Sequence, residues 1–171
     1  SGFGSVRRFN ETFQALYGRA PSDLRRRKVE AEAGGVIKIG LSYRPPYDWD
    51  AMMTTLATRG VAGEAVVNGA WTRRLRPDVD GTDGAVTVRP AQPGKAAVEA
   101  RIDNLKALPG VLARVRRVFD LAADPEAITR DLSADPVLHA AIRARPGLRL
   151  AGDWIDAGAD VARHRRALAA V

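Results

Sequence analysis

Between residues 36 and 102, the apolar and polar positions follow the pattern of short β-strands. Val86 and Val88 alternate with Thr87 and Arg89, so the two valines are predicted to share one face of a strand. Asn68-Gly69 stands between two runs of strand-forming residues and predicts a tight hairpin. Strands are expected at residues 36–41, 65–67, 70–76, 85–89 and 96–102.

Helical spacing precedes, interrupts and follows these strands. In residues 5–17, Ser5 is a suitable N-cap, and Phe9, Phe13 and Leu16 recur on one face. Hairpins with segregated helices indicate an α+β fold, in which residues 36–102 form one antiparallel sheet covered by helices near 49–59 and 106–119. Two further short helices are expected after the Asp-Pro caps at 124–125 and 135–136, ending near Leu132 and Ala144.

Composition narrows the chemistry. The 171 residues include no Cys and two His, which excludes a disulfide framework, a thiolate zinc site and a cysteine nucleophile. The 27 basic and 20 acidic side chains give a net charge of +7, and 23 of the basic residues are Arg. Arginine binds phosphate in a bidentate manner, so this surplus suits nucleic acid. A GC-rich genome would raise Arg, Ala and Gly together, and that alternative stays open.

Three segments are expected along the chain. Residues 1–33 contain a basic cluster, Arg25-Arg26-Arg27-Lys28, which runs into the Gly-rich connector 30–35. Residues 36–121 carry the strands and the main helices, and residues 122–171 carry the short helices. Because the chain starts at Ser1 and not at Met, it is expected to be a fragment or a processed product.

The first segment resembles the end of an AraC-type helix-turn-helix domain. The resemblance covers about 27 residues and rests on Gly2-Phe3 before the cap, Phe9 and Phe13, and Gly18-x-x-Pro21-Ser22 before Leu24-Arg25. It implies a recognition helix whose N-terminal half enters the major groove of DNA. The helix that should precede Gly2 is absent, so only weak binding of double-stranded DNA is expected. The DNA-binding residues expected on this helix are Ser5, Val6, Arg7, Arg8, Asn10 and Glu11. The alternative is an ordinary amphipathic helix with a solvated basic face.

The second segment resembles the N-terminal domain of the AlkA family, the DNA-3-methyladenine glycosylases II. The family pattern runs over roughly residues 38–152, and its motifs occur in the family's order: Leu41 to Trp49, Arg59-Gly60-Val61, Gly69 to Arg73, Arg116 to Leu121 and Arg145 to Arg149. The resemblance implies a sheet-plus-helices domain like half of the TATA-binding-protein saddle. Together, the two segments resemble bacterial fusions of an AraC-type regulator with an AlkA glycosylase.

The resemblance also implies what this chain lacks. In the family, the catalytic Asp follows a helix-hairpin-helix beyond the point where the pattern ends here. No catalytic residue, cofactor or metal is therefore expected. Leu108-Pro109-Gly110-Val111 mimics that hairpin, but Leu112 occupies the second glycine position, so we predict a helix start. Asp153, Asp156 and Asp160 are interpreted as helix-start and surface charges.

Two further groups of residues have two interpretations each. Tyr43, Tyr47 and Trp49 form either a base-stacking platform or a structural seal at the end of the sheet, and we favour the seal. The arginines at 73, 74 and 76 lie on one strand, so at least one is expected to reach solvent, where a phosphate contact is the less favoured alternative.

The expected function is that of a non-catalytic, DNA-binding or scaffold part of an alkylation-repair protein. Its parent would join a DNA-binding regulator to a glycosylase that excises alkylated purines, and the remaining glycosylase domain would be its partner. Alternatives are a compact glycosylase with an unrecognised acid and a transcription regulator whose second domain senses a ligand. A cytoplasmic location without membrane contact is expected, because the longest apolar stretch is far shorter than the ~20 residues of a span.

Overall fold

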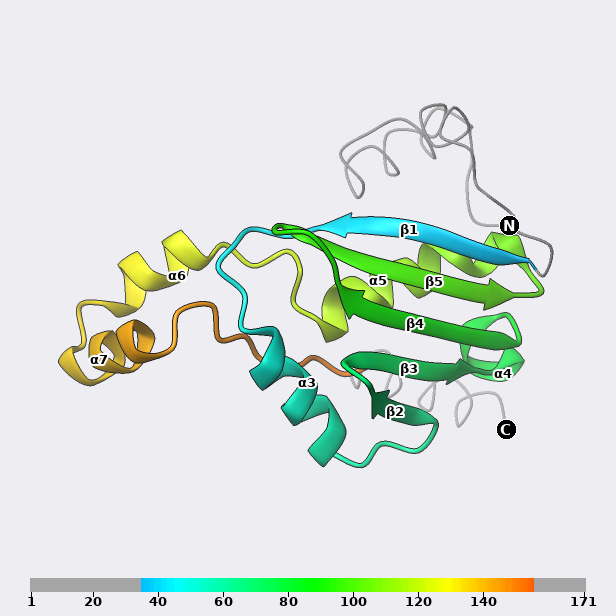
Figure 1. Cartoon of the computed structure of the whole chain (residues 1–171), viewed down its shortest axis with the longest axis horizontal. Coiled ribbons are helices and arrows are strands. Elements are labelled where there is room, and N and C mark those ends of the chain that lie inside the picture. Colours follow the sequence, from blue (N-terminus) through cyan, green and yellow to red (C-terminus); the bar gives the residue numbers. More distant parts are fainter. Residues whose placement is uncertain (1–34, 156–171) are drawn as a thin grey trace, which may run out of the picture.

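A computed structural model describes residues 35–155 (Figure 1). Its centre is a five-stranded sheet in the order β1-β5-β4-β3-β2, in which every neighbouring pair is antiparallel. The strands are β1 (Val36–Ser42), β2 (Glu64–Val67), β3 (Ala70–Leu75), β4 (Gly84–Pro90) and β5 (Lys95–Ile102). The helices are α3 (Trp49–Thr58), α4 (Pro77–Asp80), α5 (Leu108–Val118), α6 (Pro125–Leu132) and α7 (Pro136–Ala144).

The predicted α+β class and antiparallel sheet are confirmed. Strands β2 to β5 follow one another as a meander, while β1 joins the far edge beside β5. Asn68 and Gly69 both have positive φ, 51° and 69°, as the two central residues of a tight hairpin turn require. The register that follows pairs Val67 with Ala70 and Trp71 with Val88.

Within the part of the chain that the structure describes, one face of the sheet is buried and the other is not. Along β4, Val86 and Val88 are fully buried, whereas Thr87 between them is not. Helix α5 passes behind the sheet in Figure 1 and supplies the facing apolar side chains. The core also takes residues from α3, and its members include Leu41, Met52, Leu56, Trp71, Leu75, Val98, Val111, Leu112, Val115 and Phe119.

The helix starts follow their cap residues. Asp48, Asp124 and Asp135 accept hydrogen bonds from backbone N–H groups in the first turns of α3, α6 and α7. Pro109 lies in the first turn of α5, so the Leu108–Val111 segment is the predicted helix start and not a hairpin.

Two details differ from the prediction. The helix expected from Lys106 begins as a 3-10 helix, Leu105–Ala107, capped by the Asn104 side chain, and becomes α-helical at Leu108. The short helix α4 was not predicted, because four residues are too few for a periodic pattern. Pro77 opens it, Gly81 ends it in the left-handed conformation, and its last residue, Asp80, is buried.

Helices α6 and α7 form a pair that extends from one end of the sheet (Figure 1). Neither contains a buried residue, and large apolar side chains on both are exposed, including Ile128, Leu132, Val137 and Leu138. After α7 the chain returns to the core, where Gly152 N–H donates to the Val118 carbonyl and Trp154 is buried. No helix within residues 35–155 is long and apolar enough to cross a membrane.

Two strand glycines provide a matched test of this sheet. Gly84 has φ 138°, and a Cβ there would lie 1.9 Å from the Arg101 carbonyl oxygen on β5, whereas a Cβ at Gly40 would meet nothing within 4 Å. We expect Gly84→Ala to lower the free energy of unfolding by roughly 2–4 kcal/mol, because the backbone of β5 must shift. Gly40→Ala should change it by less than about 1 kcal/mol. Urea denaturation followed by circular dichroism measures both, and equal effects would contradict the register.

Candidate functional site

The six residues expected to contact DNA lie outside the described residues. Ser5, Val6, Arg7, Arg8, Asn10 and Glu11 all fall within residues 1–34, so their DNA-binding role stays a prediction. The side chains whose positions are described belong to the second and third segments. Polar or aromatic side chains with internal contacts form four groups there, and two hollows lie beside α6.

The aromatic residues at the β1–α3 connection pack against one another. The rings of Tyr47 and Trp49 stack with centroids 4.4 Å apart, and Tyr43 contacts both rings. Trp49 Nε1 donates to Tyr43 Oη at 3.1 Å, and Tyr47 Oη donates to the Phe119 carbonyl at 2.6 Å. Since the polar atoms are used internally, the favoured interpretation as a structural seal is supported.

Arg149 packs against this aromatic group. It is 7% exposed, and its guanidinium lies 4.9 Å from the centre of the Tyr47 ring. The same guanidinium donates to the carbonyl oxygens of Arg44, Asp120 and Ala123. Burial raises the pKa of the Tyr47 hydroxyl far above its usual range, although Arg149 opposes that shift. Tyr47 therefore stays a neutral hydrogen-bond donor.

A buried carboxylate network lies beneath β2 and β3. Glu64 accepts hydrogen bonds from Arg73 Nη1 at 2.7 Å, Arg59 Nη2 at 3.0 Å and Trp71 Nε1 at 3.1 Å. Arg59 also donates to the Gly152 carbonyl at 2.8 Å. Three donors around one carboxylate leave little of it for a substrate, so this network holds the fold together.

A second buried carboxylate, Asp80, is used in the same way. It accepts from Trp154 Nε1 at 2.7 Å and from the Arg76 backbone N–H at 2.9 Å, and Arg114 Nη1 lies 3.5 Å away. The Trp154 ring lies 5.0 Å from the Arg73 guanidinium, which connects the two networks. Both networks therefore anchor the segment that returns from α7.

An apolar groove runs between α6, α7 and the returning segment. Ile128, Leu132, Ile142, Leu148 and Leu150 line it, with Asp120 and Arg149 at its polar end. Burial raises the pKa of the Asp120 carboxyl, and the nearby Arg149 opposes the shift. A perturbed carboxyl beside a groove has the character of a functional group. Most of the other lining side chains are aliphatic, so the groove has the character of a contact surface.

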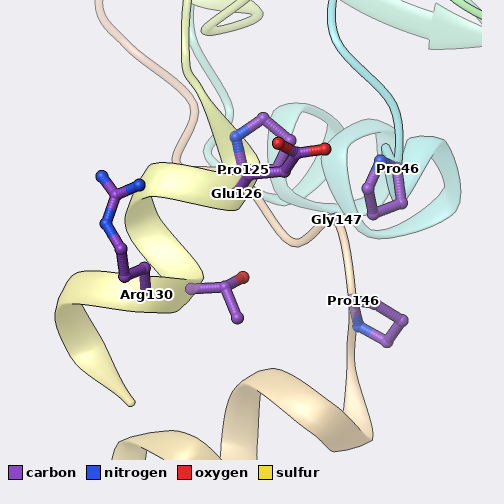
Figure 2. A pocket seen from close by; sticks show the side chains of 7 residues that line it. Pro46, Pro125, Glu126, Arg130, Pro146 and Gly147 are labelled. Carbon is purple, nitrogen blue, oxygen red and sulfur yellow. The ribbon is translucent and has the colours of Figure 1, made fainter. Parts of the chain in front are cut away.

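A separate open hollow of about 350 Å³ lies beside the start of α6 (Figure 2). The rings of Pro46, Pro125 and Pro146 form much of its wall. Glu126 directs its carboxylate towards the hollow, while Arg130 extends away from it (Figure 2). The wall of the hollow offers few hydrogen-bonding groups to a small molecule. It therefore gives no support to the alternative of a transcription regulator that senses a ligand.

A family model for the AlkA N-terminal domain matches residues 38–155. The chain belongs to the AlkA N-terminal domain family. A probable bifunctional transcriptional activator/DNA repair enzyme AlkA of Mycobacterium tuberculosis is 35% identical over 156 residues, which cover 88% of this chain and 31% of that protein. DNA-3-methyladenine glycosylase 2 of Escherichia coli is 37% identical over 117 residues, 66% of this chain and 38% of that protein. The chain thus spans about a third of the length of these relatives.

A solved structure shares the fold of this AlkA N-terminal domain. The 3-methyladenine DNA-glycosylase from Archaeoglobus fulgidus superposes with a TM-score of 0.54 at 21% identity, over 67% of this chain and 38% of that one. At that identity the comparison supports the fold alone.

The described part of this AlkA N-terminal domain does not show a catalytic constellation. Its two buried carboxylates are engaged by structural donors, and Asp153 has a side chain that is 82% exposed, in agreement with its interpretation as a surface charge. Within residues 35–155 there is no group of three or more His, Asp or Glu that could hold a metal ion. Asp156 and Asp160 lie outside these residues.

The two arginines of β3 have opposite environments. The prediction that at least one arginine of this strand reaches solvent is confirmed. Arg73 is 6% exposed and bound to Glu64, while its neighbour Arg74 is exposed on the other face. The sequence did not identify Glu64 and Asp80 as the partners that matter. Glu64 lies directly opposite Arg73 across the Asn68-Gly69 hairpin, so this contact was within reach of the sequence. The contact of Asp80 with Trp154 joins residues 74 positions apart, and no local spacing gives a signal for it.

These two arginines provide a matched test of the network. We expect Arg73→Met to lower the free energy of unfolding by about 3 kcal/mol, because the buried Glu64 loses a charged donor. Arg74→Met, at the adjacent exposed position, should change it by less than about 0.5 kcal/mol. Thermal and urea denaturation of both variants measure the free energy of unfolding. If Arg73→Met lowers it no more than Arg74→Met does, the contact of Arg73 with Glu64 adds nothing to stability.

Proposed function

We propose that this chain is a non-catalytic, DNA-binding part of a protein that repairs alkylated DNA. The match of residues 38–155 to the AlkA N-terminal domain carries this proposal. The relatives in Mycobacterium tuberculosis and Escherichia coli support it, because they are named as a DNA repair enzyme and a DNA-3-methyladenine glycosylase. The parent protein would excise alkylated purines in base excision repair.

The proposal includes an AraC-type recognition helix in residues 1–33. The mycobacterial relative is named a transcriptional activator as well as a repair enzyme, and its alignment of 156 residues extends beyond the 118 residues of the AlkA N-terminal match. That extension supports a regulator-derived segment fused to the AlkA N-terminal domain. In this proposal Ser5, Val6, Arg7, Arg8, Asn10 and Glu11 face the DNA.

The partner of the described domain is a glycosylase domain in the parent protein. The apolar groove between α6 and α7 is the surface for this contact, since exposed aliphatic side chains at helical spacing require a covering partner. The chain spans only about a third of its relatives, which leaves most of each relative to supply such a domain.

The first prediction of this proposal concerns catalysis. The purified chain, incubated with duplex DNA containing 3-methyladenine or hypoxanthine, should release no free base above background, because its buried carboxylates are engaged by structural donors. Chromatography of the supernatant measures release, with the Escherichia coli glycosylase as the positive control. Base release that disappears in Asp120→Asn would overturn the proposal and would establish a compact glycosylase with Asp120 as its acid.

The second prediction concerns the helix of residues 5–17. The chain should bind duplex DNA in the non-specific range, roughly 10⁻⁴–10⁻⁶ M at physiological salt, with little sequence preference. Arg7→Ala with Arg8→Ala should weaken binding equally on all duplexes and reduce the log–log salt slope by up to about 1.8, since each phosphate contact contributes about 0.9.

A matched pair of exposed arginines serves as the control for this experiment. Arg130→Ala with Arg143→Ala removes the same charge from α6 and α7 and should have a smaller effect. Titrations by fluorescence anisotropy compare one natural operator-like duplex with its scrambled version. Nanomolar binding to one sequence and not to the other at ~150 mM salt would show a competent sequence reader, contrary to the non-specific range expected here.

A further inference from the structure

No element within residues 35–155 covers the outer face of the sheet. In each strand the residues that alternate with the core positions point to this face, and none of them is buried. In Figure 1 this face is turned towards the viewer, with α5 behind it and no described helix in front. We define this outer face by its residues on the five strands: Val36, Lys38, Gly40, Ser42, Ala65, Val67, Ala70, Thr72, Arg74, Ala85, Thr87, Arg89, Lys95, Ala97, Glu99 and Arg101.

The charge of the outer face is strongly one-sided. It carries five cationic side chains and one carboxylate, Glu99, which forms an ion pair with Arg89 at 2.8 Å. Arg74 and Arg101 have no carboxylate within ion-pair distance among residues 35–155, and Lys95 contacts only the uncharged Ser42 hydroxyl. The net charge of about +4 indicates an anionic partner.

The spacing of the cations on the outer face favours an extended polyanion. Small residues lie between the cations: Ala85 pairs with both Arg74 and Arg101, and Gly40 pairs with Ala97. The Thr72 and Thr87 hydroxyls meet at 3.1 Å in the middle of the sheet. Strands lie about 4.8 Å apart, so Arg74 on β3 and Arg101 on β5 are separated by roughly 10 Å at the backbone.

The outer face contains no aromatic side chain among its described residues. Proteins that bind single-stranded nucleic acid through an open sheet stack bases on aromatic rings, so that mode of binding lacks its main interaction here. Cations and hydroxyl groups without aromatics are the set that contacts the sugar-phosphate backbone of a duplex.

Two other occupants of the outer face are disfavoured by charge. A second copy placed face to face would bring two surfaces of like sign together. The segment of residues 1–33 has seven basic and four acidic side chains, so it also carries excess positive charge.

We propose that the outer face of the sheet is a docking surface for the phosphate backbone of duplex DNA, bound without reading base sequence. The charge of the outer face indicates a polyanion, and the proposed repair function is used only to identify that polyanion as DNA.

The experiment compares two triple variants of the whole chain. Arg74→Gln, Lys95→Gln and Arg101→Gln remove three cations from the outer face, while Arg76→Gln, Lys106→Gln and Arg143→Gln remove three exposed cations elsewhere. Binding to a short undamaged duplex is measured by fluorescence anisotropy over a series of salt concentrations. The outer-face variant should bind about tenfold more weakly, and its log–log salt slope should be shallower by about 2.7, with the control changed by less than about twofold.

Several results would overturn the docking surface. Equal losses in the two variants would show that only net charge matters. Tighter binding of a single strand than of the duplex would contradict the backbone mode. Polyglutamate that binds as tightly as DNA, with the same sensitivity to the outer-face variant, would assign the surface to an acidic protein.

The docking surface and the proposed function fail in different experiments. If the outer-face variant behaves like the control while Arg7→Ala with Arg8→Ala abolishes binding, the docking surface is wrong and the helix of residues 5–17 carries the affinity. If the chain releases damaged bases by itself, the non-catalytic function is wrong, and the two triple variants still decide whether the outer face holds the duplex.

Discussion

The buried indole N–H of Trp71 needs a hydrogen-bond acceptor, and most of the buried polar side chains are arranged around that need. Its ring packs at the centre of the core against Phe119 and Trp154, so its N–H needs an acceptor inside the protein. Glu64 is that acceptor, and a buried carboxylate in turn needs cationic donors, which Arg59 and Arg73 supply. Arg59 then reaches the Gly152 carbonyl, so the requirement extends from one side chain to a segment about 80 residues away along the chain.

The one-sided burial of the sheet divides the molecule into surfaces of different character. The inner face holds the core and both carboxylate networks, which leaves the outer face with cations and small residues. The apolar groove lies apart from both, beside α6 and α7 (Figure 1). The proposed polyanion surface and the proposed domain contact therefore lie on separate parts of the molecule, so that occupation of one would not block the other.

Local patterns were sufficient to predict most elements, because each depends on residues close in sequence. The Val86–Val88 alternation, the Asn68-Gly69 turn and the Asp-Pro caps all formed as expected. The pairing of β1 with β5 and the roles of Asp80 and Arg149 depend on contacts between distant residues, for which spacing gives no signal. The pairing of Glu64 with Arg73 could have been predicted, because the two residues face each other across the predicted hairpin. The AlkA resemblance supplied the family, which periodicity alone does not identify. The expected DNA-reading helix lies outside the described residues, so it stays a prediction.

The connection that carries α6 and α7 leaves and re-enters the domain at one place. At its start Asp124 forms an ion pair with Arg44, and at its end Arg145 binds Asp48 while the Gly147 carbonyl accepts from the Asp48 N–H. Both ends are thus fastened to the single loop of residues 44–48. The length of chain between them has no effect on how the strands pair. A change in the length of α6 or α7 would therefore leave the register of the sheet intact, while it would alter the apolar groove that these helices line.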